Sequence, residues 1–247
     1  MRVTTVDYER YARERPIFWG DFTYPRLFER AIKGLRGTYV DLGAGDGGQI
    51  KSALDRGSLA SFSRIVAVDI SAERVARVRE LLPRIEAIVA DAASVPLADA
   101  SVDFLFSSQV IEHVADDRAM AGEIRRLLAP RGCAVVGSVL RLWGAWYVYR
   151  RNGRTVLDPT HEREYASAEE YSAVFRDAGL RVEEVHVESI RYPLSDLAIR
   201  MLLALRLMKG DAAGSIYQRH PSLSRLRRVT LAVPRYRHIF ALVSRPR

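Results

Sequence analysis

The sequence predicts an α/β fold in which a doubly wound, mostly parallel β-sheet carries helices on both faces. Short apolar segments rich in β-branched residues alternate with helical patterns along the middle of the chain. These segments are apolar throughout, as strands covered on both faces are. Residues 39–48 contain the end of the first of these segments and the glycine-rich turn that follows it, after which a helix begins. That arrangement is typical of nucleotide-like ligands bound at the carboxyl end of a strand.

The first 36 residues are expected to form an aromatic segment followed by a leading helix. From Pro25 to Leu35 the apolar residues fall on one helical face, and Gly37 ends the pattern. We expect this helix to pack on the sheet and the preceding segment to cover the bound ligand. That segment mixes charges with five aromatic side chains, namely Tyr8, Tyr11, Phe18, Trp19 and Phe22.

The core of the fold is expected at residues 37–189 and 237–247, in one domain with elaborations. Strands are predicted at residues 38–42, 64–70, 85–91, 102–108, 133–140, 181–189 and 238–245. Helices are predicted between them at residues 48–56, 72–82, 116–129 and 167–178. Ser71 and Ser167 are the predicted caps of two of these helices. Residues 141–166 are expected to be irregular and aromatic.

Residues 190–236 are predicted to form a basic, partly apolar helical insertion. Positions 197–208 are apolar nearly all round a helical wheel, so this helix is either buried or faces a lipid or a partner. Residues 190–247 hold twelve lysines and arginines and two aspartates, a net charge of +10. This asymmetry indicates an anionic partner, or else a solvated basic surface. We expect the insertion to act as a lid, a partner contact or a membrane contact.

Composition excludes several classes of protein. The single cysteine, Cys133, excludes a disulfide framework and a multi-cysteine metal site, and without metal-ligand spacing no metal is predicted. The first 15 residues are polar and charged, which predicts no secretory signal. No apolar run reaches the roughly 18–20 residues that a membrane span needs. We therefore expect a cytoplasmic protein, and the basic region leaves peripheral attachment to an anionic membrane surface open.

The glycine-rich turn has two readings. Gly43, Gly45 and Gly47 are spaced G-x-G-x-G, while Gly43, Gly45 and Gly48 also satisfy the dinucleotide pattern G-x-G-x-x-G. Asp41 discriminates between them, because a carboxylate in this turn repels a pyrophosphate and suits a ligand with a positive end. S-adenosylmethionine has a sulfonium and an ammonium and no phosphate. The alternative to a ligand site is a tight strand–helix turn with only a structural role.

The stretch V-D-L-G-A-G-D-G at residues 40–47 resembles the first motif of the class I methyltransferases. Over residues 24–189 and the last strand, the chain resembles the type 11 group, typified by the ubiquinone/menaquinone-biosynthesis methyltransferases. The resemblance implies a seven-stranded, Rossmann-like sheet whose last strand inserts antiparallel beside the sixth. It also implies S-adenosylmethionine as cofactor and S-adenosylhomocysteine as product.

By this resemblance, Asp69 binds the cofactor ribose, Asp91 and Ala92 bind the adenine, and residues 107–109 contact the methionine part. The complete set of expected cofactor-binding residues is Asp41, Gly43, Ala44, Gly45, Gly47, Asp69, Ile70, Asp91, Ala92, Ser107, Ser108 and Gln109. The motif [D/N]-P-P-[Y/F] is absent after the fourth strand, which argues against methylation of DNA bases.

Two histidines are the candidate catalytic residues. His113 occupies the histidine of the family's E-H-V motif and is interpreted as an active-site wall, with a structural hydrogen bond as the alternative. His161 is the better candidate for contacting the acceptor, because histidine can act as a base for a hydroxyl proton. Its alternative role is to fix a loop. Aromatic side chains of the same connector are predicted to line an apolar acceptor pocket, with an interior-facing loop anchor as the alternative for any one of them: Trp143, Trp146, Tyr147 and Tyr149.

The leading functional prediction is methyl transfer from S-adenosylmethionine to a small-molecule, lipid or glycan-linked acceptor. Three alternatives stay open: an RNA methyltransferase that uses the basic region, with nucleic acid the less favoured partner, a non-catalytic cofactor-binding subunit, and an NAD-linked oxidoreductase. The sequence does not specify the acceptor atom or the oligomeric state.

Overall fold

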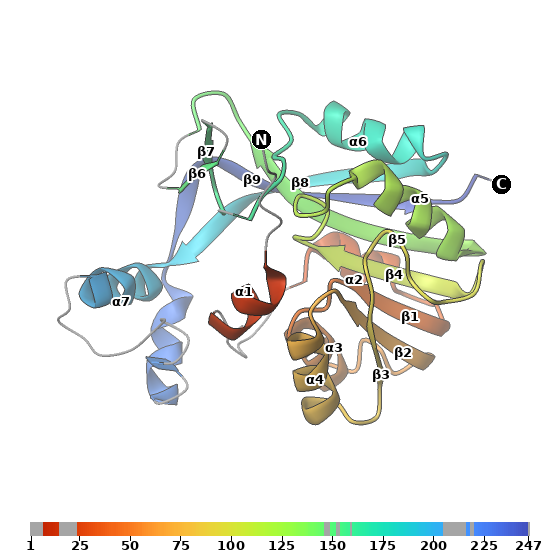
Figure 1. Ribbon diagram of the computed structural model, residues 1–247, viewed down its shortest axis with the longest axis horizontal. Coiled ribbons are helices and arrows are strands. Elements are labelled where there is room, and N and C mark those ends of the chain that lie inside the picture. The colour runs from red at the N-terminus through yellow and green to blue at the C-terminus, as the bar shows by residue number, and fades with distance from the viewer. Residues whose placement is uncertain are drawn as a thin grey trace.

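The computed structural model describes residues 7–14, 24–145, 149–151, 154–158, 160–204, 216–217 and 220–246. A seven-stranded sheet forms the centre (Figure 1). Its order is β3-β2-β1-β4-β5-β9-β8. The strands are β1 (Gly37–Leu42), β2 (Phe62–Asp69), β3 (Glu86–Val89), β4 (Val102–Ser108), β5 (Leu128–Arg141), β8 (Arg181–Pro193) and β9 (Thr230–Ser244).

The sheet is parallel except for β9, which pairs antiparallel with β5 on one side and with β8 on the other. The order of β1 to β4 places the ends of β1 and β4 side by side, next to the end of β2. This confirms the predicted fold class, including the last strand inserted beside the sixth predicted one.

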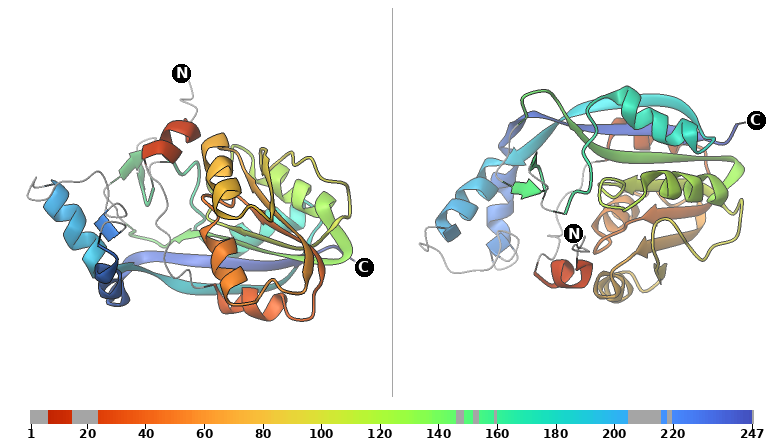
Figure 2. Two further views of the ribbon diagram at one scale, coloured as in Figure 1. Left: turned by 90° about the horizontal axis from the view of Figure 1, so that it is seen from below. Right: turned by 45° about the horizontal axis from the view of Figure 1, so that its top comes forward.

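Helices cover both faces of the sheet, as Figures 1 and 2 show. One buried apolar cluster contains side chains of α5 (Asp117–Leu127) and α6 (Ala168–Asp177), and a second contains those of α2 (Arg26–Ala31), α3 (Gly48–Asp55) and α4 (Ala72–Leu81). Neighbouring residues of β1 divide between the clusters, since Tyr39 lies in one and Val40 in the other. Burial on both faces explains why the central strands are mostly apolar.

The predicted caps begin their helices. The Ser71 hydroxyl accepts a hydrogen bond from the Arg74 N–H at the start of α4. The Ser167 hydroxyl accepts one from the Glu170 N–H at the start of α6, and the Glu170 carboxylate in turn accepts one from the Ala166 N–H. Such caps satisfy amide groups that have no partner within the helix, which fixes where each helix begins.

The strands β8 and β9 run further than the sequence predicts. Their pairing continues through Arg191 with Ala232 and Pro193 with Thr230, so both ends of the predicted helical insertion are strand. Figure 1 shows this ribbon extending beyond the rest of the sheet toward α7 (Leu194–Ala204). A separate apolar cluster, which includes Ile190 and Tyr236, packs on the extension and stabilises it. The 3-10 helix η1 (Pro221–Arg228) precedes β9.

Two further elements lie near the carboxyl ends of the parallel strands. Helix α1 (Tyr8–Glu14) packs beside α4 (Figures 1 and 2). A hairpin of β6 (Tyr149–Arg151) and β7 (Arg154–Val156) lies where an irregular segment was expected. Within the ranges given above, no helix combines the length and the apolarity needed to cross a bilayer. The predicted aromatic residues Phe18, Trp19 and Phe22 lie outside the described residues.

Candidate functional site

A cavity of about 760 Å³ opens at the carboxyl ends of β1, β2 and β4. The glycine turn and the residues after β2 and β3 form one end of it. The other end is formed by Leu157, Asp158, Thr160, His161, Glu162 and Tyr192. Tyr8 and Tyr11 of α1 also line it. Because residues from the whole length of the fold meet here, this cavity is the candidate functional site.

The glycine turn depends on backbone conformations that favour glycine. Gly43, Gly45 and Gly47 have φ angles of 80°, 56° and 79°. The amides of Gly43 and Ala44 donate to the Val68 carbonyl at 2.7 and 2.9 Å, which ties the turn to β2. A Cβ on Gly43 would collide with the Val110 side chain. The turn therefore brings backbone close to the cavity, and Gly47 begins α3 just behind it.

Asp69, at the end of β2, lies in the cavity wall and stabilises the glycine turn through a hydrogen bond. Its two carboxylate oxygens accept hydrogen bonds from the Gly45 N–H at 2.8 Å and the Ser71 N–H at 2.9 Å. Burial raises the pKa of Asp69, and these two hydrogen bonds and Arg74 oppose that rise. Each oxygen keeps a second lone pair, so the carboxylate can accept the hydroxyls of a ribose as the resemblance implies.

Asp41 lies beneath the turn and is completely buried. Its Oδ2 accepts a long hydrogen bond of 3.5 Å from the Tyr39 hydroxyl, and its Oδ1 has no hydrogen-bond partner in the described chain. Burial, reinforced by the neighbouring Asp69 carboxylate, raises the pKa of Asp41 to about 7. The residue is thus an unpaired acceptor close to the site rather than part of the cavity surface.

Gln109 provides the complementary unpaired donor. It follows β4 with a left-handed φ of 60°, lines the cavity, and its buried Nε2 has no hydrogen-bond partner among the residues that are described. A ligand carboxylate would satisfy Gln109, and β4, which Gln109 follows, is adjacent to β1 and its glycine turn. The residues in the wall therefore fit the carboxylate of S-adenosylmethionine.

Helix α1 is held over the cofactor end by Glu9. The Glu9 carboxylate accepts hydrogen bonds from the Ala72 N–H at 2.6 Å, the Ser71 hydroxyl at 3.0 Å and the Glu73 N–H at 3.2 Å. It thereby caps α4 from a different helix. Burial acts to raise the pKa of Glu9, but these hydrogen bonds outweigh it and lower that pKa. Helix α1, with Tyr8 and Tyr11 in the cavity wall, thus lies beside the site, and its role as a cover for the ligand stays a prediction.

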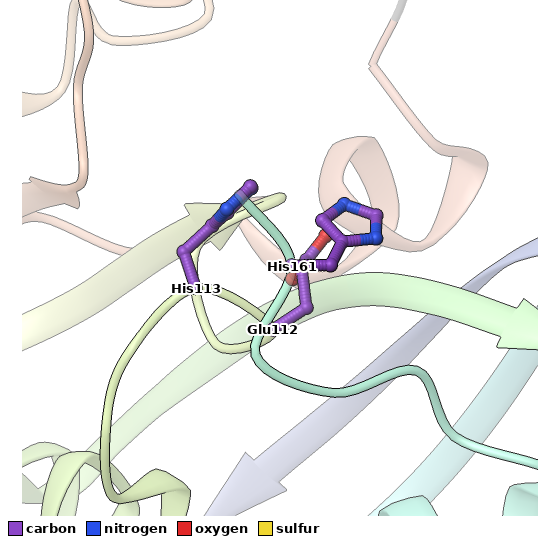
Figure 3. Close-up of side chains that lie close together, drawn as sticks. All are labelled: Glu112, His113 and His161. Carbon is purple, nitrogen blue, oxygen red and sulfur yellow. The ribbon is translucent and has the colours of Figure 1, made fainter. Parts of the chain in front are cut away.

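The other end of the cavity contains the two candidate histidines (Figure 3). Their rings lie edge to face with centroids 4.9 Å apart. The His161 Nδ1–H donates to the Glu164 carboxylate at 2.8 Å. The Thr160 hydroxyl donates to Asp158 at 2.6 Å, so it must accept from the His113 Nδ1–H at 2.9 Å. Both rings therefore leave Nε2 as a lone-pair nitrogen when neutral.

The pKa values of the two histidines shift in opposite directions. Burial lowers the pKa of His113, although the nearby Glu112 and Asp158 carboxylates oppose it. Burial acts in the same sense on His161, but its hydrogen bond to Glu164 and the surrounding carboxylates outweigh burial and raise the pKa. His161 therefore holds a proton more readily than His113 does.

The structure brings most of the expected site residues to one cavity. Those in its wall are Gly43, Ala44, Gly45, Asp69, Ile70, Asp91, Ala92, Ser108, Gln109, His113 and His161. Asp41, Gly47 and Ser107 are not in the wall; the buried Ser107 hydroxyl instead donates to the Leu42 carbonyl at 2.7 Å. No ligand contact tests their roles, so the individual assignments remain predictions.

The prediction that Trp143 lines an apolar pocket is wrong. Trp143 occupies a turn directly after β5, where its side chain is 90% exposed and takes no part in the cavity wall. A turn that follows a strand on the surface gives its side chains no neighbours to pack against. Trp146, Tyr147 and the side chain of Tyr149 lie outside the described residues.

Sequence reasoning missed several wall residues. Asp158 and Thr160 belong to the string D-P-T, which the sequence presents only as a failed match to a DNA-base motif, yet they anchor His113. Leu157 and Tyr192 were not identified, because they reach the cavity from the hairpin and from the unpredicted extension of β8. The alternation of apolar and polar residues through I-R-Y-P was the available signal for that extension.

Comparisons with known proteins agree with this geometry. Residues 40–136 match a family model described as a methyltransferase domain. A probable S-adenosylmethionine-dependent methyltransferase of Mycobacterium tuberculosis is 35% identical over 116 residues, which cover 47% of this chain and 40% of that protein. Malonyl-[acyl-carrier protein] O-methyltransferase of Enterobacter lignolyticus is 26% identical over 205 residues, covering 79% of this chain and 74% of that protein.

The match thus spans less than half the length of the mycobacterial relative. Among solved structures, phosphoethanolamine N-methyltransferase 2 of Haemonchus contortus, in complex with phosphomonomethylethanolamine and S-adenosylhomocysteine, has a TM-score of 0.60 at 17% identity, covering 90% of this chain and 52% of that chain. This likeness shows the shared fold. Residues 40–136 thus match a methyltransferase domain, and this part of the chain is similar to S-adenosylmethionine-dependent methyltransferases.

Proposed function

We propose that this chain transfers a methyl group from S-adenosylmethionine to a small-molecule, lipid or glycan-linked acceptor. The observation that carries the proposal is a single cavity that joins the glycine turn and Asp69 at one end to His113 and His161 at the other. A ligand at the glycine turn and a second molecule at the histidines would share one enclosed space. Two-substrate transfer needs that arrangement.

When bound, the cofactor supplies an activated methyl group, so the chain mainly has to provide proximity, orientation and exclusion of water, which contribute roughly 7–11 kcal/mol. The turn, Asp69 and Gln109 orient the donor end. Tyr8 and Tyr11 of α1 cover the cavity and limit the access of water. At the acceptor end, His113 and His161 present imidazole nitrogens to a hydroxyl, carboxyl or amine group.

The polar character of the acceptor end supports an acceptor with a charged or hydroxyl-bearing group. Asp158, Thr160, His161 and Glu162 lie in the wall there, with Leu157 as their apolar neighbour. One relative is named for the malonyl group of an acyl carrier protein, and one similar structure holds phosphomonomethylethanolamine. These names support small polar acceptors for this chain as well.

RNA is a weaker candidate, because several arginines of the basic region are engaged within the chain. Arg227 pairs with Asp196 at 3.3 Å and lies over the Tyr217 ring, and Arg191 donates to the Thr230 hydroxyl and carbonyl. Arginines held in this way are less available to bind phosphate groups.

The deciding experiment is transfer of a labelled methyl group by the purified chain to separate small-molecule, lipid, glycan and RNA pools. We expect label in one of the first three pools. Label in RNA alone, combined with strongly salt-dependent RNA binding, would replace the proposed acceptor class with RNA.

Calorimetry completes the test, because it measures cofactor binding without an acceptor. We expect S-adenosylhomocysteine to bind and NAD not to bind. Binding of NAD alone would overturn the proposal, whereas binding of S-adenosylhomocysteine without transfer to any pool would favour a non-catalytic subunit.

A further inference from the structure

We propose that Glu112, His113 and His161 bind one divalent transition-metal ion at the acceptor end of the cavity. The three side chains come from two loops, one after β4 and one before α6 (Figure 3). Each offers one ligand atom, and these atoms all lie within 4.8 Å of one another. The sequence shows no ligand spacing, because the two loops meet only in the folded chain.

The histidines are oriented as metal ligands usually are. In metal sites, a ligating histidine donates its other ring N–H to a carboxylate, a carbonyl or water, which fixes the ring and its tautomer. Here the His161 Nδ1–H donates to Glu164 at 2.8 Å. The His113 Nδ1–H reaches the Asp158 carboxylate through the Thr160 hydroxyl. Both rings therefore keep Nε2 for an ion.

Glu112 supplies a second, independent observation. Its side chain is completely buried, and its Oε2 accepts a hydrogen bond from the Ser138 hydroxyl at 2.9 Å. Its Oε1 has no hydrogen-bond partner in the described part of the chain. A buried carboxylate oxygen without a hydrogen-bond partner destabilises the folded chain, and a bound cation would remove that penalty.

The backbone holds the two loops together. The amides of Glu162 and Arg163 donate to the Glu112 carbonyl at 2.8 and 3.2 Å. Arg163 also donates from its guanidinium to the carbonyls of Ile111 and Val114. Ligands about 2.0–2.2 Å from a zinc ion lie roughly 3–4 Å from one another, so side-chain shifts of about 1 Å would close the site.

The donor set selects the class of ion. Two imidazole nitrogens and one carboxylate oxygen favour Zn²⁺, Fe²⁺, Co²⁺ or Mn²⁺, whereas Mg²⁺ and Ca²⁺ prefer all-oxygen sites. Three protein ligands leave at least one coordination position open, and His113 and His161 both line the cavity. Resting on the proposed function, we infer that this open position takes an oxygen of the acceptor.

The test is a metal titration of the chelator-treated full chain. Zn²⁺ is followed by calorimetry, and Co²⁺ by its visible absorption. We expect one ion per chain, with affinity at least tenfold weaker in Glu112→Gln and His161→Gln. Glu164→Gln is expected to weaken binding about 10–100-fold, because this residue positions the His161 ring. Absence of stoichiometric binding to the unsubstituted chain overturns the proposal.

His186→Gln is the matched control. His186 lies on β8 within 3.6 Å of the Glu188 carboxylate, and its side chain is partly exposed. Removing it should leave metal affinity unchanged, so an equal loss in this variant would show adventitious binding and contradict the proposed site. Thermal unfolding of every variant shows whether the substituted chains are folded.

S-adenosylhomocysteine titrations separate this inference from the proposed function. We expect the metal-free chain and His161→Gln to bind S-adenosylhomocysteine as the unsubstituted chain does. Cofactor binding without metal binding refutes only the metal site. Metal binding without cofactor binding refutes only the proposed methyl transfer, and leaves the site as a metal-binding site of other use.

Discussion

At the residue scale, Asp41 couples stability to pH. Its pKa of about 7 in the folded chain exceeds the ordinary value of 3.8, so the folded chain binds the proton more tightly than the unfolded chain does. The stability contributed by this group is complete below pH 3.8, falls as the pH rises, and is lost above about pH 7. Burial is the cause, because it penalises the charged carboxylate.

Asp41→Asn should remove this dependence. Between about pH 4 and pH 7, the free energy of unfolding of the cofactor-free chain should fall relative to that of the variant by up to ~1.4 kcal/mol per pH unit. Urea unfolding of both proteins across this range measures the difference, in which the titrating groups that do not interact with Asp41 cancel. Parallel curves would show that Asp41 is already ionised at low pH.

Gly43 and Gly34 allow the destabilisation caused by backbone strain to be measured separately from that caused by a steric collision. Both have left-handed φ angles, 80° and 77°, but a Cβ on Gly43 would collide with Val110 while nothing lies within 4 Å of one on Gly34. Gly34→Ala should cost about 1–2 kcal/mol through backbone strain alone. Gly43→Ala should cost roughly 1–3 kcal/mol more and abolish binding of S-adenosylhomocysteine. Unfolding and calorimetry measure both, and equal losses in the two variants would contradict this account.

At the scale of single elements, α1 depends on Glu9. Glu9→Ala should lower the affinity for S-adenosylhomocysteine several-fold, because α4 loses a cap worth about 1 kcal/mol and α1 loses its attachment. Calorimetry gives the affinity, and hydrogen exchange of residues 7–14 reports the release of α1. Glu80→Ala, an exposed substitution on the same α4, is the control. Unchanged exchange in Glu9→Ala would show that other contacts hold α1.

Local signals explain which elements the sequence predicts. Apolar periodicity locates α3, α4, α5 and α6 closely, and serine caps mark the starts of α4 and α6, since neighbouring residues decide both features. The extensions of β8 and β9 escape prediction because each depends on its pairing partner. The hairpin of β6 and β7 has a local signal, the Asn152-Gly153 pair between Arg151 and Arg154, which the expectation of an irregular segment overlooks.

The residues of the candidate site also divide into those that local sequence predicts and those that depend on distant segments. The glycines are predicted because a single strand–turn–helix unit fixes their places, and Asp69 is predicted because it ends the next strand, β2. The pairing of His113 with His161 and the cap that Glu9 provides are not predictable from the sequence, because each joins segments far apart in it. Sequence reasoning therefore describes the donor end of the cavity better than the acceptor end.

At the scale of the whole molecule, β9 closes the sheet. Deleting residues 237–247 removes the part of β9 that pairs with β5 and β8 through the core, together with its buried side chains Ile239 and Phe240, and leaves one edge of β5 unpaired. We expect this chain to lose its cooperative urea unfolding transition and its near-ultraviolet circular dichroism. Deleting residues 246–247, beyond β9, should preserve both. A cooperative transition in the longer deletion would show that β1 to β5 fold alone.

The position of β9 also determines how the molecule assembles during synthesis. The ribosome completes β5 long before β9, since residues 142–229 must be translated between them. At roughly 5–20 residues per second, that interval lasts on the order of ten seconds. Throughout it, one edge of β5 presents unpaired amide and carbonyl groups, which can recruit another strand. The nascent chain is therefore most prone to aggregate in the window between these two strands.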